Sequence, residues 1–522
     1  MKLKPHLPLL VCILTIMAPS RGRTAPASDR PNVIVILADD LGYGDLGCYG
    51  AKAIKTPQID QLAAQGLRFT QAYAPASTCM PSRYSFLTGD YAWRQPPRKT
   101  SILDGDAPLS IDPGSTTLPA LFQRAGYATG LVGKWHLGLG DGQTPVDWNG
   151  KVSPGPLEIG LDHAFYFPAT LDRVPCVFVQ DHNVVGLDPG DPISVSYLHP
   201  FPGGAIGTEH PHWLKMGADR QHSESIINGI SRIGYMSGGH AARWVDEAMA
   251  DTLLAQATHF IEQNRDHPFF LYYAAHEPHV PRVPGPRFRG DTDLGPRGDS
   301  IAEFDWVVGR ILHTLDRLDL TKNTLVILSS DNGPILFDGY YDGAQEKNGS
   351  HEPAGGLRGW KYLIYEGGMR VPFIARWPGH IRPGESSGMI CLTDLLATAA
   401  DLTGQPLPPD AGIDSIDALP LLLSQPSAKA RTNLVEQGIS GAIALREGDW
   451  KYVPANVATQ ASGMGSGANP NDARFRDSII PKTLLFNLVD DPTESHNVAA
   501  DHPDKVAELA RELAAIQKET RR

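Results

Sequence analysis

The sequence predicts an α/β protein built on a doubly wound, mostly parallel sheet, with a small α+β subdomain at its C-terminal end. Apolar runs of strand length alternate with amphipathic helical segments, which is the pattern of such a sheet. With 41% hydrophobic and 20% charged residues, the 522-residue chain can bury a large core. Beyond about residue 426 the alternation is replaced by short strand-like pieces. We therefore expect a main domain over 28–425 and a subdomain over 426–522.

The first strand and the first helix of the main domain carry clear boundary signals. Residues 33–37 form a continuous apolar run rich in β-branched side chains, as in a strand covered on both faces. Thr56 and Pro57 predict a helix with a hydroxyl cap and a proline in its first turn, which ends at Gly66. Further helices are expected at 118–125, 246–264 and 301–318, followed by strands at 128–132, 269–274 and 325–328. In such a sheet the functional residues lie beyond the carboxyl ends of the strands.

Two regions depart from this alternation. Residues 140–240 are rich in Gly, Pro and His without clear periodicity, so we expect loops and short strands inserted over the functional site. Their seven histidines, between His163 and His240, lack the ligand spacing and supporting residues of a metal site, and we interpret them as loop residues, some of them near a substrate. The subdomain is expected to contain strands at 442–445, 450–453 and 484–488, a polar loop at 461–472 and a helix from residue 503.

Charge and the N-terminal segment exclude some partners. The chain has 46 basic and 58 acidic residues, a formal charge of −12, and no basic run, so nucleic acid is not an expected partner. Lys2 and Lys4 precede an apolar stretch, 7–18, and a small-residue cleavage site, which predicts a secretory signal peptide over 1–27. Because a membrane span needs about 20 apolar residues, we expect an exported, periplasmic or secreted protein without a membrane anchor. Four cysteines follow this segment, too few for disulfides to stabilise the fold.

Two acidic pairs follow predicted strands. Asp39 and Asp40 come after the first strand, and Asp331 and Asn332 after the strand at 325–328. Taken singly, each pair is better explained as a helix cap or a turn. Together, three carboxylates and an amide at one edge of a sheet form a hard oxygen set that suits Ca²⁺ or Mg²⁺. The sequence therefore favours a metal site at this edge.

Cys79 is expected at the start of a short helix that ends at Gly89. Pro81 lies in the first turn of that helix, so the thiol would face its positive end. A free cysteine so placed is usually either a small core residue or an activated thiolate. Its position alone leaves both interpretations open.

The sequence around Cys79 narrows this choice. Residues 79–83 read Cys-Met-Pro-Ser-Arg, a C-x-P-S-R pattern followed by Leu-Thr-Gly at 87–89. This segment resembles the signature of the type I sulfatases, a branch of the alkaline-phosphatase-like superfamily, although Met80 is bulkier than the residue usual there. The resemblance extends over about 31–498. It implies that the main domain is catalytic and that a dedicated maturation enzyme oxidises Cys79 to formylglycine.

Further segments carry the remaining residues that this resemblance implies. Gly-Lys-Trp-His-Leu-Gly at 133–138 implies that Lys134 and His136 stand beside the nucleophile. Ala-His-Glu-Pro-His-Val-Pro at 275–281 selects His279 on the substrate side. Leu-Arg-Gly-Trp-Lys at 357–361 resembles the family's lysine segment and selects Lys361, although the family more often has glycine before that lysine. The two acidic pairs match the family's two metal strands.

The resemblance implies a sulfuric ester hydrolase with one Ca²⁺, Mg²⁺ being less favoured, held by Asp39, Asp40, Asp331, Asn332 and the diol of hydrated formylglycine at position 79. In the implied reaction one hydroxyl of the diol attacks sulfur while Arg83 holds the diol. His279 or Lys361 then protonates the departing alcohol, and His136 takes the proton of the second hydroxyl so that sulfate is expelled. The expected substrates are sulfated glycans, with aryl sulfates as surrogates.

Two alternatives remain open at this stage. A phosphate or phosphonate ester hydrolase of the same superfamily would use related residues. The zinc phosphatases have Ser or Thr as nucleophile and a two-metal set of Asp and His, whereas no metal-ligand His pair follows Asp331 and Asn332 here. A secreted glycan-binding relative without turnover is the second alternative, although every implied catalytic position holds a competent residue.

Overall fold

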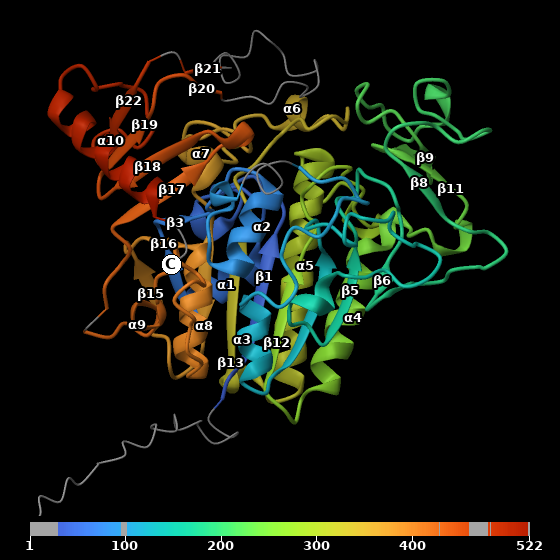
Figure 1. The fold of residues 1–522 in the computed structure, drawn as a ribbon, viewed down its shortest axis with the longest axis horizontal. Coiled ribbons are helices and arrows are strands. Elements are labelled where there is room, and N and C mark those ends of the chain that lie inside the picture. The colour runs from blue at the N-terminus through green and yellow to red at the C-terminus, as the bar shows by residue number, and fades with distance from the viewer. Residues whose placement is uncertain (1–29, 96–101, 427, 459–478, 481, 520–522) are drawn as a thin grey trace, which may run out of the picture.

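The computed structural model describes residues 30–95, 102–426, 428–458, 479–480 and 482–519 (Figure 1). The expected signal peptide, 1–27, and the expected polar loop, 461–472, lie outside the described residues. Within the described part of the chain, no helix is both long and apolar enough to cross a membrane. The four cysteines described there are all free thiols.

A ten-stranded sheet forms the centre of the main domain. Five adjacent strands are parallel, in the order β13 (Thr324–Ser330), β1 (Asn32–Ala38), β12 (Phe269–Ala274), β4 (Ala128–Lys134) and β5 (His163–Phe167). Every residue of β1, β12 and β13 is buried, as the apolar run at 33–37 predicts. The sheet continues on one side through β14 (Phe373–Arg376), β2 (Leu67–Phe69) and β15 (Gly384–Ser386), and on the other through β6 (Val179–Gln180) and β7 (Asn183–Val184).

Helices cover both faces of this sheet. One group consists of α1 (Pro57–Ala64), α4 (Met249–Gln263) and α5 (Gly295–Arg317), in which α1 and α4 each contact α5. A second group consists of α2 (Cys79–Thr88), α3 (Leu118–Arg124) and α8 (Leu395–Thr403). The shorter helices and strands are α6 (Ala344–Lys347), α7 (Glu366–Met369), α9 (Leu419–Leu422), β3 (Ala72–Tyr73) and β16 (Ile390–Cys391). The predicted doubly wound fold is confirmed.

The N-terminus of α1 differs from the sequence expectation. The Thr56 hydroxyl accepts a hydrogen bond from Gly47 N and donates to Asp60, so it does not cap the helix. The carboxylate of Asp305, from α5, instead accepts hydrogen bonds from Gln58 N and Ile59 N at 3.0 and 2.8 Å. A tertiary partner has replaced the local one, because the free N–H groups of a first turn can donate to any nearby acceptor oxygen.

The region 140–240 contributes three strands to the central sheet, which the sequence analysis did not expect. β6 and β7 form one edge of the sheet. β5 joins them to its centre, because it pairs in parallel with β4 and antiparallel with β6. Its five residues are too few to show a strand period beside the irregular sequence around them. The remainder consists of loops and short strands, at the right in Figure 1: β8 (Ser194–Ser196), β9 (Ile226–Ile227), β10 (Ile230–Ser231) and β11 (Tyr235–Ser237).

The C-terminal part forms a small antiparallel sheet, drawn in red in Figure 1. Its strands are β17 (Asn433–Gln437), β18 (Ile443–Glu447), β19 (Trp450–Val453) and β22 (Leu484–Asn487), covered by α10 (Pro503–Lys518), and a separate pair is β20 (Val457–Ala458) and β21 (Ile479–Ile480). The buried Lys451 ammonium joins this sheet to α7, since it lies 3.2 Å from Glu366 and 2.7 Å from Glu436. The expected α+β subdomain is therefore present and packs against the main domain.

Gly133 allows β4 to lie close to β12 just before the functional edge of the sheet. Its φ is +117°, and a Cβ built there would lie 1.9 Å from the carbonyl oxygen of Ala274. We expect Gly133→Ala to lower the free energy of unfolding by about 3–5 kcal/mol, because it adds backbone strain to a clash with a fixed strand. Gly114→Ala is the matched control, since its φ is +81° but nothing lies within 4 Å, and should cost about 1–2 kcal/mol. Equal losses in urea unfolding would contradict the steric argument.

Candidate active site

The carboxyl ends of β1 and β13 bring the two acidic pairs together. Ala38 and Ser330, the last residues of these strands, are register partners, and Asp331 N donates to Ala38 O at 3.1 Å. Asp40 N donates to the Asp331 carboxylate at 3.2 Å. Asp40 has a φ of +66°, a left-handed conformation uncommon for a residue with a side chain. The chain therefore turns sharply at this point and directs successive carboxylates into one buried space.

Each of the three carboxylates is paired with a cation. Lys134, the last residue of β4, lies 2.6 Å from Asp39. Lys361 lies 2.8 Å from Asp40, and the Arg83 Nε donates to Asp331 at 2.8 Å. All six side chains are buried, so these are strong interactions in a water-poor environment. Three formal negative and three formal positive charges thus oppose one another at the sheet edge.

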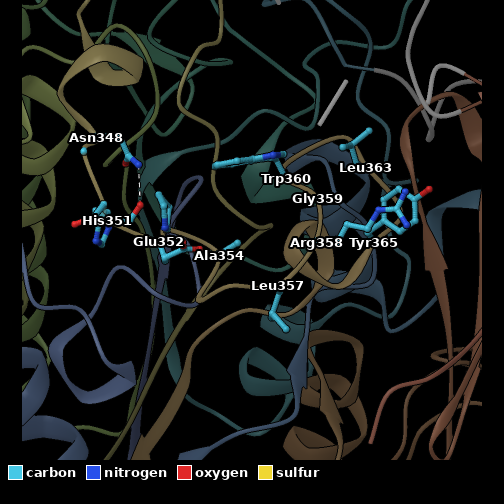
Figure 2. A pocket seen from close by; sticks show the side chains of 13 residues that line it. Asn348, His351, Glu352, Ala354, Leu357, Arg358, Gly359, Trp360, Leu363 and Tyr365 are labelled. Carbon is cyan, nitrogen blue, oxygen red and sulfur yellow. Dashed lines mark hydrogen bonds between the residues drawn. The ribbon is translucent and has the colours of Figure 1, made fainter. Parts of the chain in front are cut away.

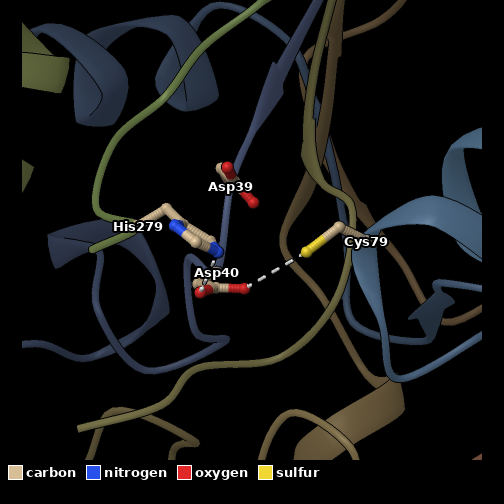
Figure 3. A group of neighbouring side chains, drawn as sticks. All are labelled: Asp39, Asp40, Cys79 and His279. Carbon is tan, nitrogen blue, oxygen red and sulfur yellow. Dashed lines mark hydrogen bonds and ion pairs between the residues drawn. The ribbon is translucent and has the colours of Figure 1, made fainter. Parts of the chain in front are cut away.

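The carboxylate cluster also retains free oxygen ligands. Asp39, Asp40, Cys79 and His279 each offer one ligand atom within 4.8 Å of the others, and Figure 3 shows the four side chains pointing toward one another. Asp39 Oδ1 and Asn332 Oδ1 are buried without a hydrogen-bond partner among the described residues. Asn332 Nδ2 donates to Asp40 at 2.8 Å, which leaves the amide oxygen free to act as a ligand. These oxygens fit a hard divalent cation.

Cys79 is the first residue of α2 and faces the carboxylates. Its Sγ lies 4.0 Å from Asp40 Oδ1. Burial raises the pKa of the thiol above its ordinary value, an effect that Lys134 and Lys361 oppose only in part. The unmodified side chain is therefore a thiol rather than an activated thiolate. Arg83 lies four residues further along α2 and donates from Nη1 to the Tyr272 hydroxyl at 3.0 Å.

His136 lies just beyond β4 with one ring nitrogen free. Its Nε2 lies 3.2 Å from the carbonyl oxygen of Leu103, which requires a proton on Nε2, and Nδ1 is buried without a partner among the described residues. Burial lowers the pKa of His136 well below its ordinary value, and Lys134 and Arg173 act in the same direction. A neutral imidazole with a free Nδ1 lone pair can accept a proton.

His279 lies in the loop after β12. Its Nδ1 donates to Val280 O at 2.7 Å, so Nε2 faces Asp40 Oδ2, at 3.8 Å. Burial, followed by Lys361 and Lys134, lowers the pKa of His279 well below its ordinary value. The ring is therefore neutral before substrate binds. An anionic substrate placed between these cations would favour its protonation.

Lys361 has a partner that the sequence did not indicate. Asp338 lies 2.9 Å from Lys361 Nζ and also accepts from the Tyr362 hydroxyl at 3.0 Å. Burial alone would lower the pKa of Lys361, but the nearby carboxylates of Asp338 and Asp40 raise it well above its ordinary value. Neither Asp338 nor Tyr272 lies in a recognisable motif. Asp338 is 23 positions away from Lys361 in the sequence, so no local pattern connects the two residues. The structure brings all of the predicted site residues to one edge of the sheet and adds these two.

A separate pocket of about 370 Å³ lies along residues 348–365, and Figure 2 shows its lining side chains, among them Trp360. It contains none of the predicted site residues. Arg358 lies 3.9 Å above the Tyr365 ring and donates to Glu494 O, and His351 bonds to Asp45. These side chains have structural partners, so we do not place the reaction in this pocket.

Comparison with known proteins gives a consistent result. The family model described as Sulfatase matches residues 31–405. An N-acetylgalactosamine-6-O-sulfatase of Bacteroides thetaiotaomicron is 45% identical over 490 residues, which are 94% of each chain. Human arylsulfatase A is 34% identical over 93% of this chain and 87% of its own. A solved structure concerned with the metabolism of multiple glycosaminoglycans by the same bacterium is 44% identical with a TM-score of 0.88, covering 94% of this chain and all of that one.

Proposed function

The chain belongs to the sulfatase family and is a sulfuric ester hydrolase, and from this premise we propose that it removes sulfate from a sulfated glycan sugar with a formylglycine derived from Cys79 as nucleophile. The observation that carries the proposal is the position of Cys79 at the start of α2, 4.0 Å from Asp40 and opposite the three paired cations. The raised pKa of the thiol also favours a nucleophile other than a thiolate. The glycan class follows from the 45% identical relative, an N-acetylgalactosamine-6-O-sulfatase.

The proposed metal is Ca²⁺, held by Asp39, Asp40, Asp331, Asn332 and residue 79. The free oxygens of Asp39 and Asn332 support this set. When bound, such an ion supplies positive charge beside the sulfate ester and the nucleophile. With Asp338 included, four carboxylates face the cations of Lys134, Lys361 and Arg83, so a divalent ion would change the formal charge of the site from −1 to +1. That local excess suits an anionic sulfate even though the whole chain is acidic.

We expect elemental analysis to find about one hard divalent ion per chain, because oxygen ligands disfavour zinc. Asp39→Asn should lose most of that ion and at least about 100-fold in activity, since it removes both a ligand charge and the partner of Lys134. Asp246→Asn is the matched control, a buried carboxylate 2.7 Å from Arg232 and outside the site, and should keep the ion. Stoichiometric zinc, with activity restored by zinc alone, would contradict this proposal.

The surrounding side chains divide the proposed reaction between them. Lys134, Lys361 and Arg83 stabilise the charge of the transferring sulfuryl group and orient residue 79. His279 or Lys361 protonates the departing alcohol, and His136 accepts through its free Nδ1 the proton whose loss lets sulfate depart. Catalysis in this proposal consists mainly of positioning and charge stabilisation.

A panel of sulfated sugars tests the proposal directly. Matured protein should release sulfate from at least one sulfated monosaccharide or oligosaccharide, and from 4-nitrophenyl sulfate as a surrogate. Turnover of phosphate esters in preference to both would favour the phosphatase alternative. We also propose that the protein is exported without a membrane anchor and is matured by a formylglycine-generating enzyme, which N-terminal sequencing of secreted material and peptide mass spectrometry can check.

A further inference from the structure

A second group of ligand side chains joins the loop of His279 to α5. After β12 the chain turns, and His279 N donates to His276 O at 2.9 Å. His279 faces Asp40, whereas His276 and Glu277 meet Glu303, which lies within α5. These three residues each offer one ligand atom within 4.8 Å of the others, and we call them the β12–α5 cluster.

The side chains of the β12–α5 cluster are buried but incompletely hydrogen-bonded. All three are more than nine-tenths buried. His276 Nδ1 and Glu277 Oε1 have no hydrogen-bond partner among the described residues. Nδ1 lies 3.1 Å from Glu277 Oε2, although not in the geometry of a hydrogen bond, and Glu303 Oε1 accepts from Gly285 N at 3.1 Å. Buried polar atoms left in this way are costly unless a further group satisfies them.

The two carboxylates of the cluster also lack a balancing cation. Among the residues that the structure describes, no lysine or arginine forms an ion pair with Glu277 or Glu303, and the one such contact is with the neighbouring His276. The carboxylates of the active site differ, since each of them has a lysine or arginine partner. Buried charges in proteins are paired or bind metal ions. The β12–α5 cluster therefore needs positive charge, either as protons or as a metal ion.

The arrangement of the ligand atoms suits a metal ion. Two ligands of a tetrahedral zinc ion, with bonds of about 2.0–2.1 Å, lie about 3.3 Å apart, close to the 3.1 Å between His276 Nδ1 and Glu277 Oε2. An imidazole nitrogen with two carboxylates is a donor set of Zn²⁺, whereas Ca²⁺ prefers oxygen ligands alone. The Tyr273 hydroxyl is also buried without a partner among the described residues. Burial, followed by the charges of Glu277 and Glu303, raises the pKa of Tyr273, so a fourth polar group lies near both carboxylates.

We propose that His276, Glu277 and Glu303 bind one Zn²⁺, at a site separate from the proposed calcium site, and that this ion fixes the loop of His279 to α5. Two carboxylates and a divalent ion are neutral together, which lowers the cost of burying them. None of the three residues belongs to the proposed reaction, so the ion has a structural role. Zinc bound here adds to the one hard ion expected above and does not replace it. The inference goes beyond the proposed function and does not depend on it.

Elemental analysis of four proteins tests this proposal. The full chain is produced in medium containing Ca²⁺ and Zn²⁺ and is then dialysed. Wild type should hold about one zinc and one calcium, and Glu303→Gln should keep calcium but hold less than about 0.1 zinc per chain, because it loses a charged ligand. Asp39→Asn should show the reverse, losing calcium and keeping zinc. Asp305→Asn is the matched control, a buried carboxylate on the same helix that binds the first turn of α1, and should keep both ions.

Thermal unfolding gives a second measurement. Zinc at about 100 times its Kd should raise the Tm of chelator-treated wild type by about 3 °C, since it binds only the folded chain. It should leave the Tm of Glu303→Gln unchanged. Without metal, Glu303→Gln should be at least as stable as wild type, because it removes one of two like charges from a buried site.

The possible failures are distinct. Wild type with less than about 0.1 zinc per chain would overturn the proposal, and this measurement depends on no variant. Zinc retained by Glu303→Gln but lost from Asp39→Asn would also overturn it, because the ion would then lie among the active-site residues. Metal-free Glu303→Gln that unfolds well below metal-free wild type would indicate that Glu303 acts through hydrogen bonds alone. No substrate enters any of these measurements, so failure of the proposed sulfatase reaction would leave them unaffected.

Discussion

Replacing Cys79 with alanine is expected to abolish sulfate release while leaving the fold intact. The substitution removes the thiol on which the proposed maturation acts, so Cβ is not oxidised to the aldehyde and activity should fall by at least about 10⁴-fold. The side chain is small and buried at the first position of α2, where alanine fits, and the loss of its packing should cost only about 1 kcal/mol of stability. Circular dichroism and thermal unfolding check the fold, and sulfate release checks the activity.

Cys176→Ala is the matched control, because this thiol is also buried and free but lies outside the site. It should retain wild-type turnover. Peptide mass spectrometry on the segment around residue 79 completes the test, since active material should carry formylglycine there. An unmodified thiol in fully active protein would rule out the proposed nucleophile.

The central strands and the acidic pairs could be predicted because their signals are local. A run such as 33–37 is long, apolar and β-branched, and the residues after it must emerge at the carboxyl edge of a parallel sheet. The positions of Asp39, Asp40, Asp331 and Asn332 directly after predicted strands are therefore enough to predict that they meet at one edge of the sheet. The resemblance to the sulfatases added Lys134, His136, His279 and Lys361, which no periodicity singles out, and the structure brings all of them to that edge.

What the sequence could not predict depends on contacts between distant segments. The cap of α1 comes from Asp305, 247 positions away from Gln58, so the local signal at Thr56 was wrong. β5 has only five residues in an irregular stretch of sequence, so no periodic pattern indicates it. Asp338 is recognisable only once the chain has folded back onto Lys361. Such residues are selected by geometry at the site and leave no pattern in a single sequence.

His136 and His279 are expected to act on opposite steps, and their variants should therefore fail differently. His136→Ala removes the acceptor with the free Nδ1 but leaves Arg83 and Lys134 in place around residue 79. The alcohol should then be released once, and sulfate should remain on the enzyme. We expect a burst of about one leaving group per active site followed by near silence, with a sulfated residue 79 in the mass spectrum.

The loss of activity in His279→Ala should instead depend on which alcohol or phenol leaves. A proton donor matters most when the departing alcohol is basic, so this variant should lose at least about 100-fold on a sugar sulfate and less than about 10-fold on 4-nitrophenyl sulfate, whose phenolate departs with little help. The neutral His279 ring faces Asp40, whereas Lys361 is held charged beside the same carboxylate. Lys361→Ala is therefore the comparison that decides between the two donors. Removal of the proton donor should reduce activity more for a basic alcohol than for a phenolate. If His279→Ala loses the same activity on both substrates, while Lys361→Ala loses much more on the sugar sulfate, then the proton comes from Lys361.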